Sequence, residues 1–129
     1  MGIDVYLHKH GESEPYIYSQ EKEGFMWGVW NGEHGYLREA YHGGPYATKE
    51  LLPECWKDGY EGELIPIKSS VLKKRLDIVV DTSRERSTNL YKEDPEDTDK
   101  TAQSFIDFVE LASRLEKESG YPCKFYASY

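Results

Sequence analysis

One short stretch of this sequence, residues 35–47 (GYLREAYHGGPYA), gathers side chains that could bind a ligand or react with it. Arg38 offers a planar, permanently charged fork for a phosphate or a carboxylate. His42 offers a group that exchanges a proton near neutral pH. The neighbouring tyrosines supply stacking faces, and Gly43 and Gly44 let a ligand approach the backbone. A ligand site of this kind would use Tyr36, Arg38, Glu39, Tyr41, His42 and Tyr46.

The same stretch has a second, plainer interpretation. Residues 36–41 contain good helix formers, and Gly43-Gly44-Pro45 would end a helix there. Arg38 and His42 would then lie four residues apart on one helical face, with Glu39 able to pair with either. Exposed ion pairs of this kind contribute little to stability. The sequence therefore leaves open whether the stretch is a ligand pocket or a polar helix with a structural arginine.

Other combinations of reactive residues are weaker. No set of a nucleophile, a base and an orienting group is visible, so binding is expected in preference to catalysis. His8 and His10 fall on one face of an expected strand, but two ligands are fewer than the three or four that a metal site uses. Cys55 and Cys123 lack metal-ligand spacing and are expected to be reduced and buried. We therefore expect no metal and no cofactor.

Charge provides a second indication of function. The chain has 24 acidic and 16 basic residues, which gives a formal charge of −8. This charge disfavours direct binding to nucleic acid or to an anionic membrane, and it suits attraction to a basic protein partner. The plainer alternative is that the acidic segments are solvated loops. A partner-binding surface would use Glu12, Glu14, Glu21, Glu23, Glu93, Asp94, Glu96, Asp97 and Asp99.

The strands that must position these groups are predicted from hydrophobic periodicity. Residues 2–8 alternate between apolar and polar, which indicates a strand with one buried face. Residues 25–30 are apolar throughout and predict a second, more buried strand. The C-terminal segment, 123–129, alternates again, and we expect it to pair with residues 2–8 so that both termini are held.

Helices are expected over residues 36–41, 46–52, 71–80 and 99–119. The helix over 99–119 has the clearest signal, because large apolar residues recur at three- and four-residue spacing and Gly120 with Pro122 ends it. The helix over 71–80 would be capped by Ser69 or Ser70. The charged residues 91–100 are predicted to be a linker, and the acids within it, over 93–99, prepare the start of the next helix.

These elements predict an α+β fold: a small, mostly antiparallel sheet of three to five strands, with two or three helices packed on one face. The length of 129 residues fits a single domain, residues 1–129. We expect no signal peptide, because residues 1–10 lack a basic region followed by an apolar run, and no apolar stretch approaches the length of a membrane span. The expected location is therefore the cytoplasm.

Three segments of the chain, MGIDVY, GYLREAYHGGPYA and the final ASY, resemble a family of small uncharacterised proteins from bacteria and their phages. The resemblance spans the chain, but it assigns no activity, ligand or catalytic role to individual positions. It implies a setting, the cytoplasm of a bacterial or phage-infected cell. Small acidic proteins in that setting often inhibit toxins or defence systems such as CRISPR.

Two hypotheses follow, from different functional classes. In the first, the protein is a non-catalytic inhibitor that docks on a basic, nucleic-acid-binding surface of a defence effector or toxin and blocks it. In the second, it is a small-ligand-binding protein or an enzyme that holds an anionic or nucleotide-like molecule at Arg38, Tyr41 and His42. The composition supports the first hypothesis across the whole chain, whereas the second depends on one short helix. We therefore prefer the first.

Overall fold

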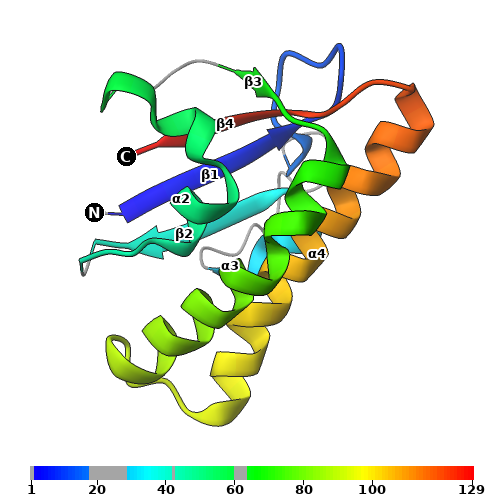
Figure 1. The fold of residues 1–129 in the computed structure, drawn as a ribbon. Coiled ribbons are helices and arrows are strands. Elements are labelled where there is room, and N and C mark those ends of the chain that lie inside the picture. The colour runs from blue at the N-terminus through cyan, green and yellow to red at the C-terminus, as the bar shows by residue number, and fades with distance from the viewer. Residues whose placement is uncertain (1, 18–28, 42, 60–63) are drawn as a thin grey trace.

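The computed structural model describes residues 2–17, 29–41, 43–59 and 64–129, and Figure 1 shows how the elements are arranged. In chain order they are β1 (Gly2–His8), η1 (Val29–His34), β2 (Tyr36–Ala40), α2 (Ala47–Leu51), η2 (Pro53–Gly59), β3 (Ile65–Pro66), α3 (Ser69–Asn89), α4 (Pro95–Ser119) and β4 (Lys124–Ser128). The labels η1 and η2 mark 3-10 helices. The helices pack against an antiparallel sheet with the strand order β2-β1-β4-β3, so the predicted α+β class is confirmed.

The sheet is organised around the N-terminal strand. β1 pairs antiparallel with β2 on one side and with β4 on the other, which confirms the expected pairing of the terminal strands. The alternation read from the sequence is also confirmed, because Ile3, Val5 and Leu7 are fully buried. On β4, Phe125 and Ala127 are buried in the same core. This face of the sheet packs against the helices.

The longest helix confirms its predicted apolar stripe and corrects its predicted start. The stripe is buried throughout and consists of Phe105, Phe108, Val109, Ala112 and Leu115. The helix begins at Pro95 because Asp94 accepts a hydrogen bond from the Asp97 backbone N–H at 2.8 Å, and proline is favourable in the first turn. Gly120 ends it in the left-handed conformation, with φ of 80°. Much of the expected acidic linker is therefore the first turn of α4.

The helix predicted over residues 36–41 is wrong, because this segment is the strand β2. Helix propensity is a weak preference, and here it is outweighed by backbone pairing with β1 and by full burial of Leu37 in the core. The strand predicted over 25–30 lies mostly outside the described residues. Its last two positions, Val29 and Trp30, begin the 3-10 helix η1 and are not part of a strand.

Of the two remaining α-helices, α2 follows the prediction, whereas α3 differs from it in length and in capping. α2 agrees closely with the predicted helix over 46–52. α3 ends at Asn89, whereas the sequence predicted its end at residue 80. Its first turn is not capped by its own serines: the backbone N–H and the hydroxyl of Ser69 both donate to the carboxylate of Glu116 on α4, at 2.9 and 3.0 Å. A neighbouring helix therefore supplies the cap, and this contact ties the two helices together.

Both cysteines are free and buried, as the sequence predicted. Removal from water disfavours the thiolate, and it raises the pKa of Cys55 to about 12 and that of Cys123 to about 11. Their sulfhydryl groups contact the backbone carbonyl oxygens of Phe125 and Ala112. Among the helices of the described residues, none combines the length and the apolar character that crossing a membrane requires.

His8, at the end of β1, is expected to make stability depend on pH. The side chain is 6 % exposed, and burial lowers its pKa below the ordinary 6.5, with a smaller opposing effect from a hydrogen bond to the Glu12 backbone. The unfolded chain therefore binds the proton more readily. The contribution of neutral His8 to the free energy of unfolding is therefore fully present above pH 6.5, and it is lost as the pH falls below that value.

The measurement is the free energy of unfolding by urea at pH 7.5, 6.5 and 5.5. His8→Phe should reduce the loss between pH 6.5 and 5.5, whereas His10→Phe, at an exposed position, should not. An equal slope in the wild type and in His8→Phe would contradict the assignment.

Candidate functional site

β2 distributes the tyrosine- and arginine-rich stretch over two faces of the sheet. Successive side chains of a strand point in opposite directions, so Tyr36 and Arg38 lie on one face and Leu37 and Glu39 on the other. The predicted adjacency of Arg38 and Glu39 on a helix is therefore wrong. The stretch contributes to two separate clusters, one on the outer face of the sheet and one between β2 and the helices.

On the outer face, Asp4 of β1 is the common partner. The Arg38 Nη1 donates to Asp4 Oδ1 at 2.7 Å, and the Tyr36 hydroxyl donates to the same oxygen. Burial and the neighbouring carboxylate raise the pKa of Tyr36, so its hydroxyl stays protonated. The Arg38 side chain remains about one-third exposed. An anionic ligand at Arg38 would have to compete with the carboxylate of Asp4.

On the helix-facing side, Glu39 caps the short helix α2. Its carboxylate accepts hydrogen bonds from the backbone N–H groups of Ala47 and Thr48, at 2.9 and 3.0 Å, and from the Thr48 hydroxyl at 2.6 Å. The residue in the N-cap position, Tyr46, makes no side-chain cap. Glu39 is 4 % exposed, so its negative charge needs a buried counter-charge.

Arg86 of α3 supplies that counter-charge. Its side chain is also 4 % exposed, and its Nε lies 2.8 Å from Glu39 Oε2. Its two terminal nitrogens donate to four acceptors, three carbonyls and one hydroxyl, which belong to Ala40, Gly43, Pro45 and Tyr91. Each terminal nitrogen of the guanidinium thereby donates twice, and Nε, which makes no hydrogen bond of its own, is held in the ion pair with Glu39.

Two aromatic rings complete the surroundings of Arg86. The guanidinium carbon lies 4.8 Å from the ring centre of Tyr46 and 5.5 Å from that of Tyr91. Tyr41, 42 % exposed, contacts Tyr46 edge-on, with the two ring centres 6.0 Å apart.

His42 lies outside the described residues. The ligand site predicted at Tyr36, Arg38, Glu39, Tyr41, His42 and Tyr46 stays a prediction, and the described members of that set are divided between two faces.

The sequence interpretation missed Arg86, although a signal for it existed. The buried positions of α3 include Leu72, Val79, Ser83 and Arg86, which follow one another at intervals of seven, four and three residues. Extending the helical periodicity beyond residue 80 would have placed Arg86 on the buried face. A buried arginine needs a carboxylate and several carbonyls, and β2 together with the loop after it supplies both.

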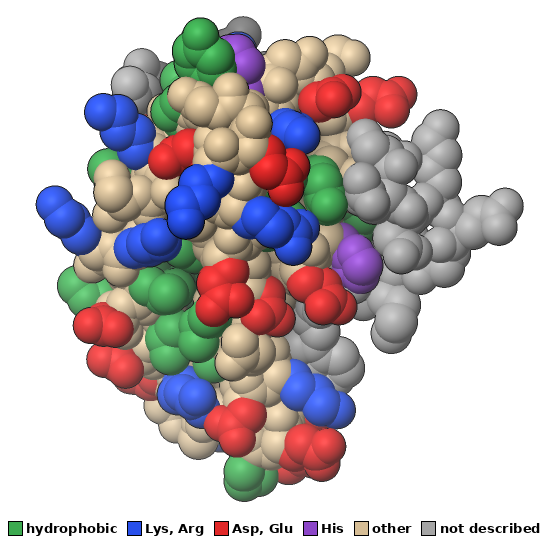
Figure 2. All heavy atoms as spheres, turned by 90° about the vertical axis from the view of Figure 1, so that its right-hand side faces the viewer, with side chains coloured by type: hydrophobic (Ala, Val, Ile, Leu, Met, Phe, Trp, Pro, Cys, Tyr) green, Lys and Arg blue, Asp and Glu red, His purple; other side chains and the backbone are tan. Residues whose placement is uncertain are grey.

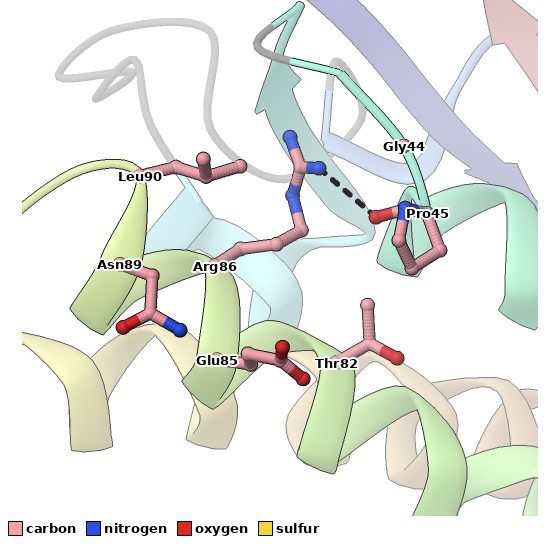
Figure 3. Close-up of a pocket in the computed structure, with 7 residues that line it drawn as sticks. All are labelled: Gly44, Pro45, Thr82, Glu85, Arg86, Asn89 and Leu90. Carbon is pink, nitrogen blue, oxygen red and sulfur yellow. Dashed lines mark hydrogen bonds between the residues drawn. The ribbon is translucent and has the colours of Figure 1, made fainter.

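A pocket of about 140 Å³ lies beside this cluster (Figure 3). Its lining residues are Gly44, Pro45, Thr82, Glu85, Arg86, Asn89 and Leu90. The loop before α2 forms one wall and the last two turns of α3 form the other, with the Arg86 side chain between them. Leu90, which is 40 % exposed, lies at the end of α3 and offers apolar surface there.

The two acidic segments lie at opposite ends of the molecule. Lys9, just before Glu12 and Glu14, pairs with Glu118 at the C-terminal end of α4. Residues 93–99 lie at the N-terminal end of the same helix, and a helix of 25 residues is about 37 Å long. Glu21 and Glu23 fall outside the described residues. The acidic residues therefore offer two separate surfaces to a partner.

The second surface is the acidic hairpin end, which we define as residues 81–100. It holds seven carboxylates and four cations, hence −3 of the formal −8. Four of the predicted carboxylates have local partners here: Glu93 accepts from Thr101, Asp94 caps α4, and Glu96 and Asp99 form ion pairs with Lys100 and Arg84. Asp97 takes part through its backbone N–H, which donates to Asp94. Figure 1 shows this end extending beyond the sheet, and Figure 2 shows carboxylates interspersed with cations on the adjoining helical face.

A second, larger pocket of about 350 Å³ is lined by Glu33, Asp107, Glu110, Leu111 and Arg114. Its carboxylates do not form a metal site: no group of three or more potential ligands that could hold an ion is found within the described part of the chain. The expected absence of a metal stays a prediction.

The fold and its candidate sites define a small acidic α+β protein with an exposed helical hairpin. Comparison of the chain with protein-family models, with curated proteins and with solved structures finds no match. The functional argument therefore depends on the geometry and the charge described above.

Proposed function

We propose that the protein is an interaction protein that docks on a basic surface of a partner protein through the acidic hairpin end. The observation that carries this proposal is the concentration of carboxylates on a helical end that extends beyond the sheet. Basic surfaces that bind nucleic acid are the natural class of partner, because carboxylates at this density present negative charge to cations as phosphates do. Occupying such a surface would block it, which is the action of an inhibitor.

The local roles of these acids do not remove their negative field. Exposed ion pairs such as Arg84–Asp99 and Lys100–Glu96 are weak, and the segment remains negative after they are counted. Arg86, the fourth cation of the segment, is buried against Glu39, so its charge is compensated inside the protein. The surface that a partner meets is therefore more acidic than the formal count of the segment suggests.

The proposal is tested with a decalysine peptide as a basic probe, titrated into the full chain by calorimetry at low and high salt. We expect the affinity to fall as salt rises, because exposed charges are screened. Glu96→Gln/Asp97→Asn removes one exposed and one half-buried charge but keeps the Asp94 cap and the Arg84–Asp99 pair. At roughly 0.5 kcal/mol for each charge, this variant should bind about fivefold more weakly.

The matched control is Glu12→Gln/Glu14→Gln, which removes two exposed charges at the opposite end of α4. The control should retain most of the affinity. Equal losses in the two double variants would show that the probe senses net charge alone, and an affinity that is independent of salt would contradict the electrostatic argument.

A further inference from the structure

The pocket beside the acidic hairpin end suggests what a partner inserts there. We propose that this pocket takes one apolar side chain, of leucine size, from a basic segment of the partner protein. The inference rests on the proposed function, and it adds a specific anchor to a surface that otherwise acts through charge. Three properties of the pocket support it: its volume, its lining and the charges around it.

The volume separates a side chain from a nucleotide-like ligand. Sites for drug-sized ligands measure roughly 300–1,000 Å³, whereas a cavity of roughly 150 Å³ accommodates a benzene-sized group. The pocket measures about 140 Å³, so it fits a single side chain. Interface anchors are commonly side chains that fill such pockets and are excluded from water.

The lining favours an apolar occupant. Pro45 and Leu90 contribute apolar surface from opposite walls, and Thr82 contributes a small side chain below them (Figure 3). The one buried charge in the lining, Arg86, is already compensated by Glu39 and donates to carbonyls of the neighbouring loop. The pocket therefore has no uncompensated cation for an anion, and the Thr82 hydroxyl and the Asn89 amide in its lining are neutral.

The surrounding charges favour lysine or arginine on either side of that apolar residue. Glu85 lines the pocket and is exposed, and Asp81 lies one helical turn away on the same face of α3. Neither makes an ion pair with another described residue, and like charges four residues apart on a helix repel each other. The pocket also lies at the C-terminal end of α3, where the helix dipole is negative.

The experiment uses the full chain, labelled with ¹⁵N, and two end-blocked peptides of sequence KKLKK and KKAKK. Amide shift changes in NMR titrations give the affinities and the location of binding. We expect KKLKK to bind at least fivefold more tightly than KKAKK, with its largest shift changes at Gly44, Thr82 and Leu90. Thr82→Phe fills the pocket and should abolish this preference. Thr88→Phe, at an exposed position of α3 outside the lining, should retain it.

The outcomes separate this inference from the proposed function. Equal affinities for the two peptides, with shifts over the acidic residues, would overturn the pocket inference and leave the charge-based docking intact. Binding of neither peptide would overturn both. A preference for KKLKK that survives in Thr82→Phe would place the anchor elsewhere and would also overturn the inference. Each variant is first shown to keep the wild-type fold by its own spectrum without peptide, so that a lost preference reports on the pocket and not on unfolding.

Discussion

Replacing Arg86 by leucine is expected to lower the free energy of unfolding by about 3–5 kcal/mol, because it leaves the buried charge of Glu39 without its partner. Leucine has a volume that the site can accept, but it cannot bind the carbonyls of Ala40 and Pro45, which Arg86 engages at 2.9 Å. These buried acceptors would then lack a donor, which adds to the loss. The loop before α2 should become disordered first.

The measurement is urea unfolding of Arg86→Leu against Arg84→Leu, the matched control two residues away. Arg84 pairs with Asp99 on the surface, where its side chain is 47 % exposed, so its loss should cost less than about 1 kcal/mol. The double variant Glu39→Gln/Arg86→Met should recover part of the stability, because it removes both charges together. Equal stability of the two leucine variants would show that the Glu39–Arg86 pair does not hold the loop.

The second large effect is expected for Gly32→Ala, which should cost about 3 kcal/mol through overpacking. Gly32 of η1 lies against α4, and its backbone N–H donates to the Ser104 hydroxyl at 2.9 Å. A Cβ at this position would lie 1.8 Å from the Ser104 carbonyl oxygen. Backbone cannot yield as a flexible side chain does, so η1 would have to move away from α4.

Gly44→Ala is the matched glycine control, since its Cβ would come no closer than 3.9 Å to atoms of Tyr46. We expect it to change the melting temperature by less than a third of the change in Gly32→Ala, as measured by calorimetry. A Gly32→Ala variant as stable as Gly44→Ala would show that η1 is not packed against α4 as described. The contact matters for the fold because η1 leads directly into β2.

Parts of the fold could be predicted because their signals are local. β1 and the stripe of α4 follow from the spacing of apolar residues, and the end of α4 follows from Gly120. The acidic residues that support the proposed function are also visible in the sequence, since charge is a property of composition. Their division between the two ends of α4 was not visible, because it depends on where the loop after β1 is held.

Residues 36–40 show most clearly what the tertiary structure decided. Their helix propensity was read correctly, but a strand forms because β1 offers hydrogen-bond partners along its edge and the core accepts Leu37. The role of Glu39 was equally inaccessible, since its counter-charge, Arg86, is 47 positions further along the chain. Hydrophobic periodicity depends on neighbours in sequence, and it predicted β1 and the buried stripe of α4. The net charge depends on composition alone, so it too could be read from the sequence. The pairing of buried charges is set by neighbours in space, and only the folded chain brings those together.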